Sequence, residues 1–249
     1  MAWVESHSLS FSARHETEDA DEAASMLDRL ERFREDLDGL FETTPWEVAV
    51  VIHSRPLQLA LAHPWLPLAR VAAAPASRRY LAGWFASGEI HVLSSAALES
   101  RASNVPGSLD ALALTPLHEY AHLVVGANND QLPPPFGPRS FARYLRWAWL
   151  CEGAATYLSG QAPHLRAAIA RRLREGAKPS FPPSARDAPL LGGTVFGLLA
   201  EQRGDEACAA LATRLDDRGA KAAIETAFER PLWDVERRWR DLLDGLTWT

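Results

Sequence analysis

The stretch "TPLHEYAHLVV", residues 115–125, organises the chain because it combines a strong helix start with polar groups in an apolar run. Thr115 can cap a helix whose first position is Pro116, where the missing N–H costs nothing, and Gly126 can end it. Most positions between them are apolar, so the predicted helix is expected to lie largely inside the protein. It stands where a β-containing first half changes to a helical second half.

Three ionisable side chains interrupt this apolar helix. Residues four apart share a helix face, so His118 and His122 can direct two imidazole nitrogens at one ion. Glu119 is turned about 100° from His118 and would lie beside the ion, where a carboxylate can accept a proton from water. This HExxH spacing arises by chance in roughly one or two chains per hundred of this composition, so alone it is insufficient. Burying three such groups is costly unless something pairs with them, and a metal ion would do so.

A third ligand is expected further along the chain, because catalytic zinc takes three protein ligands and leaves one position open. The stretch "WAWLCEGAATYLSG", residues 147–160, contains one acidic residue, Glu152, among aromatic, aliphatic and small side chains. Glu152 alone would more often be a surface residue, but together with the HExxH pattern we interpret it as a ligand. The adjacent Gly153 leaves room for close helix packing, and Cys151 is interpreted as a core thiol.

Two of these stretches, "LHEYAHLVV" and "WLCEGAATYLSG", together resemble the gluzincin zinc metallopeptidases, the thermolysin-like and aminopeptidase-like clan. The resemblance covers roughly residues 45–245 and is most specific in these two motifs. It implies that Zn²⁺ is bound by His118, His122 and Glu152, with Glu119 as the general base. The stretch "AGWFASGEIHVLS", residues 82–94, resembles the edge-strand hairpin ahead of the active-site helix in that clan. This implies that an extended peptide binds along the strand formed by Ile90, His91 and Val92.

The residue that would stabilise the oxyanion departs from the pattern of that clan. The aminopeptidase-like branch carries a tyrosine ahead of a glycine-containing helix, but the matching stretch here, "DAPLLGGTVFG", residues 187–197, has none. Three candidates are left for this role: His164, Tyr157 and Tyr144. Losing one oxyanion donor typically costs about a hundred- to a thousand-fold in turnover. Metal binding is therefore the firmer expectation.

The apolar periodicity predicts one α+β domain spanning residues 1–249. The first half alternates a strand at 7–15, a helix at 19–40, a buried strand at 46–54 and a hairpin that turns at Ser87-Gly88. After the helices at 115–126 and 141–159, the last capped by Ser140, further helices are predicted at 164–175, 190–203, 205–217, 219–229 and 231–246. The expected fold is a gluzincin-like domain with a small mixed β-sheet in an N-terminal lobe, residues 1–114. A helical lobe, residues 115–249, follows, with the zinc site between the lobes.

The composition limits the class of protein. A formal net charge of −6 argues against a nucleic-acid binder, and the arginines of "RAAIARRLREG", residues 166–176, fall on a solvated helix face. The start of the chain lacks a leader pattern and no apolar run reaches membrane-spanning length, so we expect a cytoplasmic protein without a membrane anchor. Two cysteines do not make a disulfide framework. The histidines at 7, 15, 53, 63 and 91 show no ligand spacing among themselves.

The expected function is zinc-dependent hydrolysis of a peptide or protein substrate. An endopeptidase is slightly preferred, because the acidic groups that would hold a free N-terminus are not evident in "GEIHVLS", residues 88–94. Two alternatives stay open: a zinc-binding protein of the same fold that has lost hydrolysis and acts as a binding module, and a helical scaffold without a metal. The sequence does not indicate an oligomeric state.

Overall fold

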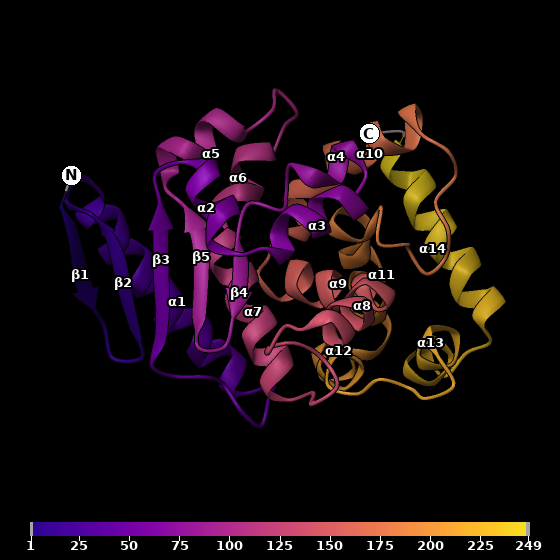
Figure 1. Ribbon diagram of the computed structural model, residues 1–249. Helices are drawn as coiled ribbons and strands as arrows, with labels where there is room; N and C mark the ends of the chain where they lie inside the picture. Colours follow the sequence, from indigo (N-terminus) through magenta and orange to yellow (C-terminus); the bar gives the residue numbers. More distant parts are fainter. Residues whose placement is uncertain (1, 248–249) are drawn as a thin grey trace.

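A five-stranded mixed sheet forms one side of the molecule and helices form the other (Figure 1). The computed structural model describes residues 2–247, and within them the strands are β1 (Trp3–His7), β2 (Phe11–Glu16), β3 (Val48–His53), β4 (Trp84–Ala86) and β5 (Glu89–Leu93). Their order is β1-β2-β3-β5-β4. The three inner strands are parallel, and each outer strand is antiparallel to its neighbour. Helices also lie between the strands, and the mixed sheet with a mainly helical second half is compatible with the predicted α+β class.

The N-terminal hairpin differs from the single strand predicted at 7–15. His7 ends β1, the Ser8 N–H donates to the Phe11 carbonyl at 2.9 Å, and β2 begins only at Phe11. Leu9, which seemed to continue the apolar alternation, is 92% exposed at this turn. The predicted helix at 19–40, the strand at 46–54 and the hairpin around Ser87-Gly88 correspond to α1 (Ala20–Asp38), β3 and β4–β5.

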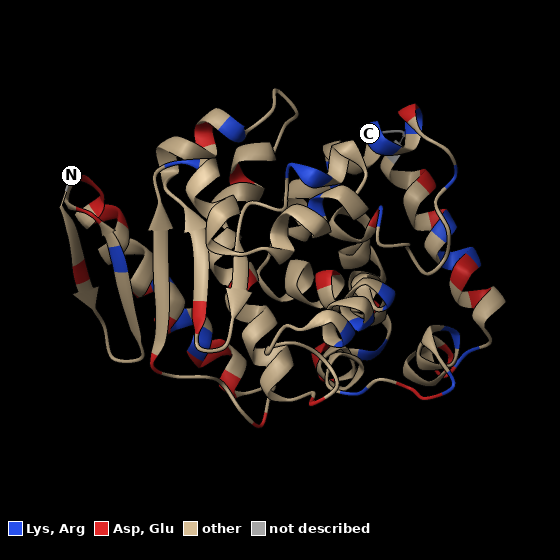
Figure 2. Ribbon diagram, in the orientation of Figure 1, with Lys and Arg blue, Asp and Glu red and all other residues tan. Residues whose placement is uncertain are grey.

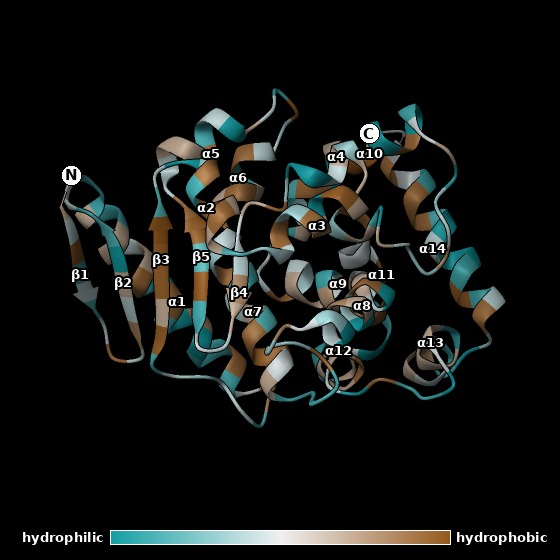
Figure 3. Ribbon diagram, in the orientation of Figure 1, coloured by the Kyte–Doolittle hydropathy of each residue, from teal (hydrophilic) through white to brown (hydrophobic). Residues whose placement is uncertain are grey.

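The two faces of the sheet carry different side chains. Val50 and Ile52 of β3 are in register with Ile90 and Val92 of β5, and all four are fully buried. This apolar face packs against α1 and α7 (Thr115–Ala127), where the Tyr120 ring meets aromatic rings of β2 and α1. Figure 3 shows the apolar character of β3 and β5. The opposite face carries the histidines of β3 and β5, because successive residues of a strand point to opposite sides.

Several short helices fall between or after the strands where the sequence analysis predicted none. They are α2 (Pro56–Ala62), α3 (Trp65–Ala72), α4 (Pro75–Arg78), α5 (Ser95–Arg101) and α6 (Ser108–Ala113). Proline stands in the first turn of α2 and α4, where its fixed φ suits a helix start. Each is too short to show a clear apolar stripe in the sequence, so only the start signals were visible.

The second half is helical, and most boundaries lie close to those predicted, although the helix predicted at 205–217 already ends at Ala212. It comprises α7, α8 (Pro138–Arg146), α9 (Ala148–Leu158), α10 (Arg166–Glu175), α11 (Ala188–Arg203), α12 (Asp205–Ala212), α13 (Ala220–Phe228) and α14 (Leu232–Thr247), with short 3-10 turns at Thr17–Asp19 and Ala162–Leu165. The single helix predicted at 141–159 is divided at Trp147, whose φ of −106° and ψ of 20° interrupt the helical backbone. Thr115 is the first residue of α7 rather than its cap, and its hydroxyl donates to the Leu112 carbonyl at 2.6 Å.

Close packing of α9 against α11 fixes the helical half. A Cβ atom added to Gly153 would lie 2.7 Å from the Gly192 carbonyl oxygen, so the two backbones approach as closely as glycine allows. Gly153 therefore leaves the room for a neighbouring helix that the sequence predicts. Because Gly153 follows Glu152 directly, this contact also sets the position of that carboxylate.

Charges of both signs are distributed over the outer elements, including α14, rather than gathered on one basic face (Figure 2). Among residues 2–247, no helix combines the length and the apolar character that crossing a bilayer requires.

Candidate metal centre

Two adjacent helices bring together the three predicted ligands. His118 and His122 lie on α7 and Glu152 lies on α9, and all three side chains are buried. The Nε2 atoms of the two histidines are 3.1 Å apart. Glu152 Oε2 lies 3.6 Å from His118 Nε2, and Glu152 Oε1 lies 3.4 Å from His122 Nε2. Among residues 2–247, no other group of three or more His, Cys, Asp or Glu side chains has ligand atoms that all lie within 4.8 Å of one another.

These distances suit a tetrahedral zinc ion. Nitrogen and oxygen ligands lie about 2.0–2.1 Å from zinc, so two ligands of a tetrahedral site are separated by about 3.3 Å. The three separations of 3.1, 3.4 and 3.6 Å bracket this value. Two imidazoles and a carboxylate are also the donor set of many catalytic zinc sites, which leave a fourth position open. His118, His122 and Glu152 therefore fit a zinc ion in spacing and in chemistry.

The three groups also shift one another's pKa values. Burial alone would raise the pKa of Glu152, but the hydrogen bonds and charges of the two imidazoles hold it well below its usual range. Burial alone would lower the pKa of His118, yet Glu152 raises it above the ordinary value. Burial lowers the pKa of His122, and the neighbouring Glu152 carboxylate offsets part of this decrease.

Glu119 lies beside the triad and outside it. It is 5% exposed, and burial raises the pKa of its carboxyl group to about 8. A Cβ atom added to Gly83 would lie 2.5 Å from Glu119 Oε1, so the chain entering β4 covers this carboxylate at the closest possible distance. The Arg70 guanidinium donates to the Leu81 carbonyl at 2.8 Å. Its positive charge offsets part of the increase in the pKa of Glu119. Glu119 is thus placed to take up a proton near neutral pH.

Further residues complete the surroundings of the triad. The Phe85 ring of β4 stacks on His122, with ring centroids 4.4 Å apart. The Tyr144 hydroxyl of α8 donates to Glu152 Oε1. Gln161 is buried, donates through Nε2 to the Ala111 carbonyl at 2.7 Å, and its side chain interacts with His118. Neither Phe85 nor Gln161 was predicted, because neither belongs to a motif that would reveal it in the sequence.

Of the three oxyanion candidates, the structure brings only Tyr144 to the triad. The Tyr157 hydroxyl instead donates to Asp205 Oδ1 at 2.5 Å, and its ring packs on Phe196. His164 has a 41% exposed side chain and lies 3.9 Å from Asp110. The structure therefore does not bring these two residues to the triad, and the face of each element on which they lie was not visible in the sequence.

The strand expected to bind a peptide lies inside the sheet. Ile90 and His91 pair with β3 on one side and with β4 on the other, and Val92 pairs with β3. All three are buried inside the sheet, so β5 has no free edge along Ile90 and His91 for another strand. The outermost strand on this side is β4, which is only three residues long.

The triad is closed in this conformation. Phe136, in the proline-rich connection between α7 and α8, packs on Trp84 and Phe85 with ring centroids 4.9 and 5.0 Å away. A cavity of about 10 Å³ reaches Glu152 and Tyr144 from the side of α3, which is room for at most one water molecule. Phe136 is thus separated from His122 by one ring, that of Phe85.

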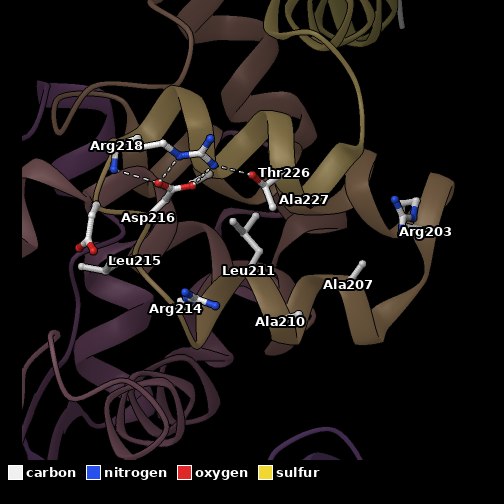
Figure 4. A pocket seen from close by; sticks show the side chains of 12 residues that line it. Arg203, Ala207, Ala210, Leu211, Arg214, Leu215, Asp216, Arg218, Thr226 and Ala227 are labelled. Carbon is white, nitrogen blue, oxygen red and sulfur yellow. Dashed lines mark hydrogen bonds and ion pairs between the residues drawn. The ribbon is translucent and has the colours of Figure 1, made fainter.

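A larger hollow lies elsewhere, between α12 and α13 (Figure 4). It measures about 570 Å³, and its rim carries Arg203, Arg214 and Arg218. Arg218 pairs with Asp216 at 2.8 Å and Arg203 pairs with Glu229 at 2.7 Å, so two of the three positive charges are already compensated. None of the predicted site residues lines this hollow.

Comparisons of the chain with protein-family models, with curated proteins and with solved structures find no match, so the site's own geometry carries the interpretation of its function.

Proposed function

We propose that this chain is a zinc-dependent metallopeptidase of the gluzincin type, which hydrolyses peptide bonds in a peptide or protein substrate. The observation that supports it is the spacing of His118, His122 and Glu152 at 3.1–3.6 Å, with Glu119 one residue along the same helix. His118, His122 and Glu152 would hold the ion. A bound zinc ion supplies a Lewis acid that activates water and polarises a carbonyl group.

The roles of the protein groups follow from their surroundings. Glu119 accepts the proton of the attacking water and passes it to the leaving amine, for which a pKa of about 8 is well matched. Tyr144 holds the Glu152 carboxylate through its hydroxyl group and is the one oxyanion candidate at the site. Burial keeps bulk water away from these groups, which strengthens every charge interaction among them.

Two substitutions distinguish a ligand from a base. Glu152→Ala removes one of three protein bonds to the ion, so bound zinc is expected to fall sharply, together with the melting temperature. Glu119→Gln keeps the size of the side chain but cannot take a proton, so zinc content stays near one ion per chain at this site while hydrolysis of a peptide library disappears. Loss of zinc from Glu119→Gln, or full zinc retention by Glu152→Ala, would contradict these assignments.

A second candidate is a zinc-binding module without hydrolysis. It is favoured by the closed site, whose cavity of about 10 Å³ admits no substrate. Phe136→Ala separates the two candidates, because it removes the ring that covers Phe85 beside His122. For a peptidase we expect this variant to cleave peptides several-fold faster than the wild type, since less of the loop must be displaced. Phe181→Ala, a ring packed on Trp239, is the control. Zinc binding without cleavage in both the wild type and Phe136→Ala supports the module.

A further inference from the structure

A second group of histidines lies on the face of the sheet opposite α7. His53 of β3 and His91 of β5 share this face, because His91 is in register with Val51 and His53 lies two residues further along β3. His63 stands at the corner between α2 and α3, and its ring meets the His91 ring edge to face with centroids 4.2 Å apart. These residues are separated by up to 38 positions in the sequence, so only the fold brings them together.

Two nitrogen atoms in this group are buried without a hydrogen-bond partner. They are Nε2 of His63 and Nε2 of His91. A buried polar atom without a hydrogen-bond partner destabilises the fold, so both atoms are available to a ligand. Glu89 Oε1 lies 3.5 Å from His91 Nε2. That separation matches the 3.4 and 3.6 Å that Glu152 makes with its two histidines.

The other nitrogen of His91 is held by His53. His91 Nδ1 and His53 Nε2 are 2.9 Å apart and share one hydrogen bond. When His91 Nδ1 is the donor, its Nε2 atom keeps a free lone pair, which is the form that ligates a metal. Burial lowers the pKa of His53 to about 4 and that of His91 to about 3, and it also lowers the pKa of His63. All three imidazoles are therefore neutral near pH 7, as metal ligands must be.

We propose that His63, His91 and Glu89 form a second site for a divalent transition-metal ion of the zinc and copper class, with His53 orienting His91. Two imidazoles and one carboxylate suit such an ion better than Mg²⁺ or Ca²⁺, which prefer all-oxygen sites. The ligand atoms do not yet converge within 4.8 Å as those of the first triad do. Binding therefore includes a turn of the His63 side chain, which is partly exposed at the helix corner.

The test counts metal ions in two independent sets of variants. The full-length protein is stripped with a chelator, loaded with Zn²⁺, dialysed and assayed for zinc per chain. We expect two ions for the wild type, one for His122→Ala, one for His63→Ala and none for the double variant. His7→Ala, which removes an exposed histidine from β1, is the control and retains two. Glu89→Gln serves as a second variant, because Glu89 is partly exposed and its loss leaves the histidine packing intact.

A readout of coordination separates ligation from folding. Co²⁺ bound to the His122→Ala protein should give visible absorption of a tetrahedral site, which His63→Ala and Glu89→Gln remove. His53→Phe keeps an aromatic ring but no acceptor nitrogen, so it should weaken this binding about 10- to 100-fold without abolishing it. A His122→Ala protein that binds no metal, or zinc content unaffected by His63→Ala and Glu89→Gln, overturns the second site. One ion per wild-type chain, lost in His63→Ala and kept in His122→Ala, would overturn the first site and leave the second standing.

Discussion

At the scale of single residues, Glu152 shows how neighbouring polar groups compensate the charge of a buried carboxylate. Its oxygens lie 3.6 Å from His118 Nε2 and 3.4 Å from His122 Nε2, and Oε1 accepts a hydrogen bond from the Tyr144 hydroxyl, so the carboxylate has three polar partners. Removing a partner from such a buried network leaves an uncompensated charge, which typically costs about 3–5 kcal/mol. In the proposed function the same oxygens ligate zinc, and their distances of 3.4 and 3.6 Å to the two histidines suit that role.

Gln161 is the residue whose effect on the site can be measured most directly. Burial lowers the pKa of His118, whereas Glu152 and the Gln161 side chain raise it. The Nδ1 atom of His118 is buried without a hydrogen-bond partner. A polar group behind a ligating histidine fixes the ring and its proton, so we expect Gln161→Leu to weaken zinc binding about 10- to 100-fold. Zinc affinity from competition with a chromophoric chelator checks this.

A matched variant separates this positioning role from stability. Gln161 Nε2 also bonds to the Ala111 carbonyl, and both Gln161→Leu and Gln161→Glu lose that bond. Gln161→Glu keeps an oxygen acceptor toward His118 and should bind zinc nearly as tightly as the wild type. Equal weakening in the two variants would show that Gln161 supports the fold and does not orient His118.

At the scale of helices, the contact between α9 and α11 controls where Glu152 lies. Gly153→Ala would place a methyl group 2.7 Å from the Gly192 carbonyl oxygen, so the two helices must separate. We expect a loss of about 1–3 kcal/mol in the free energy of unfolding, as for other overpacked cores, together with weaker zinc binding. Urea denaturation with and without zinc measures both.

The control for this variant lies on the same helix pair. Gly197 of α11 has no atom within 4 Å of an added Cβ, so Gly197→Ala should be neutral or stabilising by up to about 1 kcal/mol, from helix propensity alone. A Gly153→Ala protein as stable as Gly197→Ala would mean that the helices are not held at this distance.

How far the sequence predicts these elements depends on their length. The long helices and β3 carry enough apolar repeats to be recognised, and their ends were placed within a few residues. The segment from Pro56 to Arg78 folds into three short helices whose apolar positions are too few to show a period. Strand order is a long-range property, so the sequence could not show that β5 is an inner strand and β4 the outer one.

At the scale of the whole molecule, two polar clusters lie on opposite faces of the sheet. The sequence predicts one of them from residue spacing but not the other. His118, Glu119 and His122 occupy one helical turn, so their spacing alone predicts a shared face. His53, His63 and His91 come from two strands and a helix corner, with no spacing that relates them. Glu152 is an intermediate case. The sequence indicates it as a candidate ligand because it is the one acidic residue of its helix, but only the packing of α9 on α7 shows that it reaches both histidines.

The buried histidines also predict how acid affects the whole fold. Burial holds the pKa of His53 near 4 and that of His91 near 3, whereas unfolded histidine titrates near 6.5. Below pH 6.5 the unfolded chain therefore binds protons that the folded chain does not, and the free energy of unfolding falls as the pH drops toward 4. With a chelator present to exclude metal binding, we expect the free energy of unfolding to fall on the order of 1 kcal/mol per histidine between pH 7 and pH 5.

His53→Phe keeps the ring packing and removes one titrating group, so its stability should fall less steeply over this range than that of the wild type or of His7→Phe. Parallel curves for the three proteins, measured by urea denaturation at each pH, would show that His53 is protonated equally in the folded and unfolded chains.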